Sequence, residues 1–327
     1  MIVHFHRKPH PFHYSIEALF EAIRAHFPEG VKVEVATCPH LSQGLWPRLK
    51  NLWFAKQSRG DINHITGDVH YLAMGLPRRH TILTIHDLGF LRQSNPVLRK
   101  ILFWFWLKWP VARVQYVTTI SEATKRDILQ HLPGCPPEKI RVIPNPVLPF
   151  FKSIPKPFPD DNPTILLVGT KANKNIPRIL EALEDIPCRI QIIGEKKPDI
   201  IDLFHTYKRP HTWREHLNEA ELLQAYASSD LLLFASTLEG FGMPILEAQM
   251  VGRPVITSHI SSMPEVAGEG ACLVDPYDIA SIREGVLRVI RDADYREELV
   301  KLGRENVKRF EARAVAEQYA ELYATII

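Results

Sequence analysis

Short apolar stretches alternate with longer segments of helical periodicity along the whole chain. In the first half, the stretches rich in branched residues are 2–7, 31–37, 61–66, 80–87, 114–121 and 139–143, and the helical segments include 15–26, 95–113 and 121–132. A repeated order of strand, helix and strand is typical of parallel strands joined by right-handed crossovers. Residues 1–147 are therefore predicted to form a Rossmann-like domain.

A proline-rich segment, 144–163, interrupts this alternation, because proline cannot continue a helix or a central strand. Residues 148–163 are interpreted as a linker. The alternation then resumes, with strands at 164–169, 188–193, 211–215, 231–236, 254–258 and 271–274, and helices at 278–291, 294–309 and 313–326.

The predicted fold class is α/β, with two Rossmann-like, doubly wound parallel sheets that face a cleft. The second domain spans 164–309, and 310–327 forms a last helix, for which packing back on the N-terminal domain is one arrangement. In such sheets, ligands bind at the carboxyl ends of the strands.

Composition restricts the class of protein further. The four cysteines, Cys38, Cys135, Cys188 and Cys272, are scattered without Cys-x-x-Cys spacing, which argues against a disulfide framework or a zinc cage. No N-terminal signal pattern and no uncharged apolar run of membrane-spanning length is present. These features predict a cytoplasmic protein, with the inner face of the membrane as an alternative location.

Charge is spread unevenly over the two halves. Residues 1–150 contain 19 Lys and Arg against 10 Asp and Glu, or +9, whereas the remainder contains 21 against 27, or −6. The basic half is suited to an anionic acceptor or a lipid surface. Simple solubility explains the same count, so both interpretations stay open.

A glycine-bearing loop between a buried strand and a short helix, within 230–258, is the first candidate for chemistry. Gly240 and Gly242 permit close backbone approach, and loop amides at a helix start form an anion site suited to a diphosphate. Glu239 precedes the helix and Glu247 is expected in its first turn. A carboxylate there suits ribose hydroxyls, although Glu247 equally suits the helix dipole.

The run EGFGMPILEA around these two glutamates closely resembles the signature of retaining GT-B glycosyltransferases of glycosyltransferase family 4. Further blocks agree with it in the family's order, namely VGTKANKNIPRILEAL at 168–183, RVIPNPV at 141–147 and TISEATKRDI at 119–128. The resemblance extends over roughly residues 80–310. It implies a GT-B fold and transfer of a sugar from a nucleotide diphosphate donor.

The resemblance also implies roles for the glutamates and the loop between them. Glu247 would bind the donor ribose, and Glu239 would lie near the donor sugar's hydroxyls and the reacting centre. The donor-facing amides would be those of Gly240, Phe241, Gly242 and Met243.

The loop from Gly169 to Asn175 corresponds to the place where family members carry a basic pair that neutralises the leaving diphosphate. Lys174 aligns with the lysine of that pair. Asn173 and Thr170 stand where relatives have arginine, and Lys171 is considered as a compensating cation. Gly169, Thr170 and Lys171 are accordingly predicted to lie at the donor.

Three further positions are assigned to the donor site. His86 ends the apolar strand in ILTIHDLGF, where the family places a histidine that contacts the donor sugar. Asn145 resembles a linker-proximal asparagine of the family. Trp213 is a candidate for stacking on the base, with a core tryptophan as the alternative.

The reaction implied is hexose transfer with retention of configuration, in which the donor phosphate itself accepts the acceptor's proton. The catalytic residues predicted are Glu239, His86 and Lys174. No metal ion or other cofactor is expected, because the one Asp-x-Asp match, at 292–294, lies in a polar helical segment. The spacing of His10, His13, His64 and His70 matches no metal site either.

The expected partners are a nucleotide sugar, with mannose preferred as the sugar, and a glycan or lipid-linked acceptor, and no nucleic acid. Residues 97–113 combine basic and aromatic side chains, so peripheral membrane contact and partial burial as a core helix both remain open. Two alternative functions are a catalytically idle sugar-nucleotide-binding homologue and a GT-B epimerase or phosphorylase.

Overall fold

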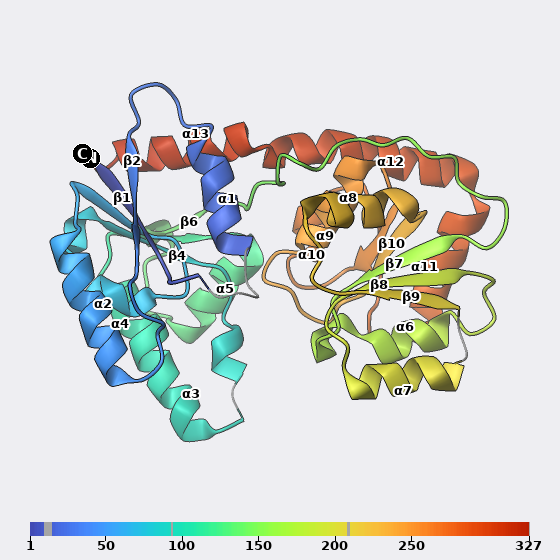
Figure 1. The fold of residues 1–327 in the computed structure, drawn as a ribbon, viewed down its shortest axis with the longest axis horizontal. Helices are drawn as coiled ribbons and strands as arrows, with labels where there is room; N and C mark the ends of the chain where they lie inside the picture. Colours follow the sequence, from blue (N-terminus) through green and yellow to red (C-terminus); the bar gives the residue numbers. More distant parts are fainter. Residues whose placement is uncertain (10–14, 93, 208–209, 327) are drawn as a thin grey trace. The chain divides into compact units, whose positions relative to one another are not determined.

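Two α/β units, each built around a parallel sheet, make up the chain in its computed structural model (Figure 1). The structure describes residues 1–9, 15–92, 94–207 and 210–326. Unit 1 consists of Met1–Pro146 together with Ala312–Ile327, and unit 2 consists of Val147–Glu311. The last segment of the chain therefore belongs with the first.

Unit 1 contains a six-stranded parallel sheet with the strand order β2-β1-β3-β4-β5-β6. In chain order its strands are β1 (Ile2–His6), β2 (Val33–Thr37), β3 (Ile62–Ile65), β4 (Thr81–Ile85), β5 (Tyr116–Thr119) and β6 (Ile140–Val142). Each predicted apolar stretch of the first half contains one of these strands. The strand order reverses between β1 and β3, as in a doubly wound sheet.

The α-helices of unit 1 are α1 (Ser15–Arg24), α2 (Leu45–Gln57), α3 (Pro96–Leu102), α4 (Trp109–Ala112), α5 (Glu122–His131) and α13 (Ala312–Ala324). A π-helical segment, η4 (Phe103–Lys108), joins α3 to α4, so the predicted helix 95–113 is one continuous stretch in three parts. Short 3-10 turns are η1 (His70–Met74), η2 (Arg78–His80), η3 (Gly89–Arg92) and η5 (Pro137–Lys139).

Unit 2 contains a second six-stranded parallel sheet, with the order β12-β11-β10-β7-β8-β9. Its strands are β7 (Thr164–Val168), β8 (Arg189–Ile193), β9 (His211–Arg214), β10 (Leu231–Phe234), β11 (Val255–Ser258) and β12 (Cys272–Val274). The helices and 3-10 turns are η6 (Ala172–Lys174), α6 (Ile176–Ala182), α7 (Pro198–Tyr207), α8 (Glu219–Ser228), α9 (Met243–Val251), α10 (Met263–Ala267), α11 (Ile279–Arg291), α12 (Ala293–Val307) and η7 (Lys308–Phe310).

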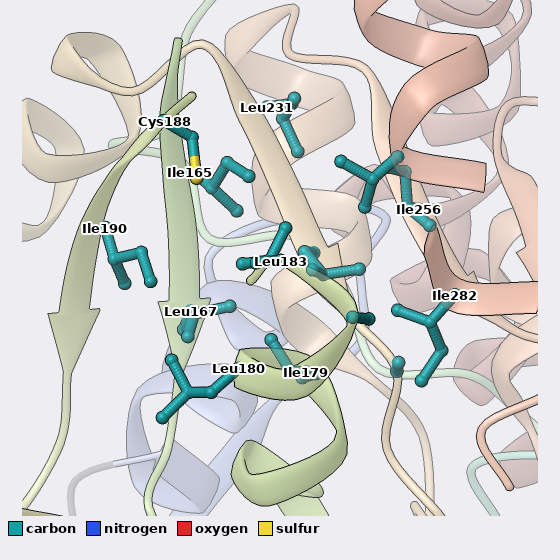
Figure 2. Close-up of a cluster of buried hydrophobic side chains, with 14 of the residues drawn as sticks. Ile165, Leu167, Ile179, Leu180, Leu183, Cys188, Ile190, Leu231, Ile256 and Ile282 are labelled. Carbon is teal, nitrogen blue, oxygen red and sulfur yellow. The ribbon is translucent and has the colours of Figure 1, made fainter. Parts of the chain in front are cut away.

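The core of unit 2 lies where one face of this sheet meets the helices. Figure 2 shows side chains of β7 and β8, such as Ile165, Leu167 and Ile190, facing Leu180 and Leu183 of the α6 segment. These residues are at most 1% exposed. Burial on this scale holds the strand ends, and the loops that follow them, in fixed positions.

Candidate functional site

The first loop of the site follows β7, at the point where the strand order of unit 2 reverses between β7 and β10. Gly169 has φ +91°, a conformation that favours glycine. A Cβ there would lie 2.6 Å from Cε of Lys174 and 3.1 Å from its Cγ. The lysine stem therefore lies across the glycine, so Gly169 makes room for the cation of the same loop.

Lys174 reaches from this loop to Glu239, which follows β10. Lys174 Nζ lies 2.7 Å from Glu239 Oε1, and the two side chains are 16% and 14% exposed. The ammonium also lies 4.4 Å from the ring centroid of Phe234, at the end of β10. Two residues that are 65 positions apart in sequence are thus joined in one partly solvent-accessible ion pair.

The Asn173 side chain holds the second loop of the site. Its Nδ2 donates to the Leu238 carbonyl at 2.8 Å and to Glu239 Oε1 at 3.2 Å. Its own carbonyl accepts from the Thr237 amide at 2.8 Å. Asn173 therefore fixes the carboxylate that pairs with Lys174.

The second loop, from Glu239 to Gly242, is held by two serines of the segment before α10. Ser261 Oγ and Ser262 Oγ both donate to the Glu239 carbonyl, at 2.7 and 3.0 Å, and Ser262 also donates to the Phe241 carbonyl at 2.7 Å. With its carbonyls taken by side chains, this loop has a fixed course into α9.

The helix α9 begins directly after this loop. Its N-cap, Gly242, has φ +114° and gives no side-chain hydrogen bond to the first turn of the helix. The positive end of the helix dipole therefore lies at residues 240–243, next to the Lys174–Glu239 pair. These are the amides predicted to face a diphosphate.

Glu247 lies in the second turn of α9, one turn later than predicted, and its carboxylate is enclosed by protein although the residue retains some exposed surface. The Tyr226 hydroxyl donates to Glu247 Oε2. Burial raises the pKa of Glu247 to about 7, against the lowering effects of the Tyr226 hydroxyl and of Lys174. Because Lys174 acts on this pKa, the structure brings Lys174, Glu239 and Glu247 into one electrostatic neighbourhood.

The other predicted residues of unit 2 have mainly structural contacts. Thr170 is buried, and its hydroxyl donates to the Glu195 carbonyl at 2.7 Å. Lys171 is exposed. Trp213 is partly buried, packs against the unit 2 core and donates from Nε1 to the Gly194 carbonyl at 2.7 Å.

His86 follows β4 of unit 1, at the carboxyl edge of that sheet. Its Nε2 donates to the Thr66 carbonyl at 2.8 Å. Gly67, with φ +148°, leaves space for the ring, since a Cβ there would lie 2.8 Å from His86 Cδ2. Burial lowers the pKa of His86, so the ring is held neutral with one fixed tautomer. Asn145 is also buried in unit 1.

Several residues of metal-ligating type have hydrogen-bond partners within the protein. His64 is buried against Tyr323 and Thr84, and His70 bonds to the Trp106 carbonyl. Asp292 caps α12 by accepting from the Tyr295 amide. His10 and His13 lie outside the described residues. In the part of the chain that the structure describes, no group of three or more His, Cys, Asp or Glu residues could hold a metal ion.

Sequence reasoning missed the supporting residues of the site, namely Asn173 as a strap, the serine pair Ser261 and Ser262, and Tyr226. Each acts on a residue at least 21 positions away. No local periodicity or spacing identifies such contacts. The adjacent serines before a proline-opened helix were the one signal available in the sequence.

The chain matches two family models of known proteins. Residues 151–306 match the family model described as Glycosyl transferases group 1, and residues 2–149 match that of Glycosyltransferase Family 4. O-antigen chain mannosyltransferase B of Escherichia coli is 29% identical over 160 residues, which are 44% of this chain and 41% of that protein.

Two further mannosyltransferases align over longer stretches. O-antigen chain mannosyltransferase RfbU of Salmonella typhimurium is 26% identical over 223 residues, 64% of this chain and 61% of that protein. MMP alpha-(1->4)-mannosyltransferase of Mycolicibacterium hassiacum is 26% identical over 258 residues, 71% of this chain and 60% of that protein. The chain thus spans less than two thirds of the length of these relatives.

Solved structures show the same fold over nearly the whole chain. Anabaena Alr3699/HepE in complex with UDP and glucose superposes with a TM-score of 0.77 at 16% identity, over 99% of both chains. Sucrose-phosphate synthase from Thermosynechococcus elongatus gives a TM-score of 0.76 at 17% identity, over 99% of this chain and 98% of that one.

Proposed function

The chain belongs to glycosyltransferase family 4 and has the GT-B fold, and from this premise we propose that it transfers a hexose from a nucleotide diphosphate sugar to a glycan or lipid-linked acceptor. The transfer proceeds with retention at the anomeric carbon and without a metal ion. The observation that carries this proposal is the Lys174–Glu239 pair beside the start of α9.

This arrangement supports the proposal because departure of a nucleoside diphosphate builds negative charge on its phosphates. A fixed cation and a row of backbone amides at a helix start stabilise such charge without reorganising. In this proposal, Glu239, which Asn173 and the serines hold in place, accepts hydrogen bonds from hydroxyls of the donor sugar. No side chain is assigned as a nucleophile, and His86 keeps its predicted role as a donor-sugar contact.

Mannose is the preferred sugar because three of the relatives above are named as mannosyltransferases. Uridine diphosphate sugars remain the alternative, since one structural neighbour is a complex with UDP and glucose. The Lys174–Glu239 pair is compatible with either base.

A thermal-shift and calorimetric titration with GDP, UDP and ADP in the presence of EDTA tests the proposal. One nucleotide is expected to raise the melting temperature, because it binds the folded state alone. Stabilisation by none of the three, with added magnesium also without effect, would contradict a nucleotide diphosphate site in this chain. Stabilisation that requires magnesium would contradict metal independence.

The affinity for the nucleotide should depend on pH through Glu247. Only the ionised carboxylate accepts two hydrogen bonds from ribose hydroxyls, and its pKa is about 7. The dissociation constant is therefore expected to fall as pH rises from 6 to 8. Glu247→Ala should weaken binding by about 1.5–3 kcal/mol at pH 8, the cost of losing a charged hydrogen-bond partner.

Calorimetry at several pH values provides the measurement, with exposed Glu269 of the same unit giving the matched control Glu269→Gln. Glu247→Gln should give an affinity that no longer changes between pH 6 and 8, because the titrating carboxylate is gone. Glu269→Gln should reproduce the wild-type pH profile. An unchanged affinity in Glu247→Ala would remove Glu247 from the ribose site.

Peripheral membrane contact through 97–113 is part of the proposal, and the structure adds α2 to it. Val97, Ile101 and Phe105 are 66%, 49% and 41% exposed along one side of the α3–η4 stretch. On α2, Trp46 and Trp53 are 74% and 65% exposed and lie opposite the buried face of the helix. In the described part of the chain, no helix is long and apolar enough to cross a bilayer.

Exposed aromatic residues on helices that contain basic and no acidic residues suit an anionic bilayer surface. Trp46→Ser/Trp53→Ser is expected to reduce co-sedimentation with vesicles containing phosphatidylglycerol, without loss of fold. Tyr277→Ser, which removes an exposed aromatic side chain of unit 2, is the matched control. Equal sedimentation of all three proteins would exclude this contact.

A further inference from the structure

A cavity in unit 1 lies at the opposite end of the strands from His86. It has a volume of about 580 Å³ and lies between the η4–α4 stretch and the loop that connects α5 to β6. Arg78 precedes β4 and Lys139 precedes β6, so the cavity is at the amino ends of these strands. Ligands of open parallel sheets bind at the carboxyl ends of the strands. This cavity is therefore separate from the site described above.

Positive charge is concentrated around this cavity. Arg78, Lys108 and Lys139 line it together with His131, and no aspartate or glutamate does so among the described residues. Throughout the described ranges, no ion pair joins any of the three strong cations to a carboxylate. Burial and the charge of Arg78 lower the pKa of Lys139. The charged lysine is thus destabilised in a way that a bound anion would reverse.

The walls of the same cavity are apolar. Phe103, Val111 and Leu132 line it and pack against the unit 1 core. A small inorganic anion would leave this surface without a partner, whereas a neutral apolar molecule would leave the cations uncompensated. A molecule with both an anionic group and an apolar part matches the cations and the apolar walls together.

We propose that this cavity binds an anionic amphiphile, a phosphate headgroup joined to a hydrocarbon chain. Arg78, Lys108 and Lys139 hold the phosphate, and the chain lies against Phe103, Val111 and Leu132. The volume of about 580 Å³ is in the range of small-molecule sites, roughly 300–1,000 Å³. The amphiphile comes either from a bilayer leaflet or from solution.

Cys135 lines this cavity and provides a direct reporter of its occupancy. It is half-buried, whereas Cys38, Cys188 and Cys272 are buried. A maleimide should therefore label Cys135 first in the folded protein. Burial already raises the pKa of the Cys135 thiol. An occupant blocks access to this thiol, and the phosphate of the occupant raises its pKa further, so both effects slow the labelling.

The test is the labelling rate of Cys135, identified by peptide mapping, with monomeric dodecyl phosphate, dodecyl maltoside or inorganic phosphate present. Dodecyl phosphate is expected to slow labelling about tenfold at nine times its dissociation constant, where about 90% of the sites are filled. Neither control compound should do so at equal concentration. A second arm uses vesicles of phosphatidic acid or phosphatidylcholine; protection by phosphatidic acid vesicles alone identifies a bilayer source.

Variants assign the effect to this cavity. Lys108→Gln/Lys139→Gln should abolish the protection, whereas Lys125→Gln/Arg126→Gln, on α5 but outside the lining, should retain it. Unchanged labelling with both dodecyl phosphate and phosphatidic acid vesicles would overturn the proposal. So would equal protection by dodecyl maltoside, or protection that survives in Lys108→Gln/Lys139→Gln. The comparison of headgroups on the wild type stands even if that variant does not fold.

Discussion

Replacing Lys174 with alanine is expected to lower the transfer rate by about 10²–10³-fold, the usual effect of removing one preorganised donor to a developing negative charge. The ammonium is fixed by Glu239 at 2.7 Å and by the passage of its stem over Gly169. In the proposed reaction, its interaction with the diphosphate would strengthen as the bond to the sugar breaks. The loss should therefore fall mainly on kcat, with a smaller change in KM for the donor.

Nucleotide release measured under saturating donor gives kcat directly. Lys301→Ala is the matched control, since Lys301 is an exposed cation of the same unit, on α12, and its rate should stay within a few-fold of the wild type. Gly169→Ala provides an independent check, because a Cβ 2.6 Å from Cε of Lys174 forces the lysine to move. A Lys174→Ala enzyme that matches Lys301→Ala in kcat would remove Lys174 from the reaction.

The strands of both sheets could be predicted from the sequence because each is a short apolar run between polar segments. In parallel sheets such runs are buried on both faces and show clearly against their surroundings. The helix α2 was not predicted, since its exposed side contains Trp46 and Trp53 and its buried side contains Asn51. A helix with apolar residues on both its exposed and its buried faces shows no one-sided hydrophobic period to detect.

The loop between β10 and α9 could be predicted only in part. Gly242, Pro244 and Gly252 define the limits of α9 by local conformation, which sequence reveals. The position of Glu247 beside Tyr226 depends on how α8 packs on α9, and the place of Asn173 depends on the neighbouring strand β10. Such long-range contacts are decided by the sheet order, which one sequence does not disclose.

Unit 1 should lose stability steeply below pH 6.5, because three histidines are buried in its sheet. The Tyr323 hydroxyl of α13 lies 2.8 Å from His4 Nε2 and 2.7 Å from His64 Nδ1, and His64 Nε2 lies 2.7 Å from Thr84 Oγ1. Arg24 donates to His6 Nε2 at 2.9 Å, so that nitrogen must be unprotonated.

Burial lowers the pKa of His64 to about 3, and burial together with Arg24 lowers that of His6 to about 4. Burial also lowers the pKa of His4. Between these values and the ordinary pKa of 6.5, the unfolded chain binds more protons than the folded one. The stability from the neutral rings is therefore complete above pH 6.5 and decreases as pH falls towards the folded values.

At pH 5, His64 and His6 each account for a loss of about 2 kcal/mol, and buried His4 adds to it, so the free energy of unfolding should drop by at least about 4 kcal/mol from its value at pH 7.5. Urea unfolding followed by tryptophan fluorescence measures this drop. Five of the six tryptophans, Trp46, Trp53, Trp104, Trp106 and Trp109, belong to unit 1, so the signal reports mainly on that unit.

His6→Gln should reduce the difference between pH 7.5 and pH 5 by about 2 kcal/mol, because one of the buried titrating rings is gone. His131→Gln, which replaces an exposed histidine of the same unit, should leave it unchanged. Equal urea midpoints at the two pH values in the wild type would mean that the buried rings accept protons without disturbing the sheet. The packing of α13 on His4 and His64 makes that outcome incompatible with the geometry, since a proton on either ring places a charge beside a buried hydroxyl that already serves both.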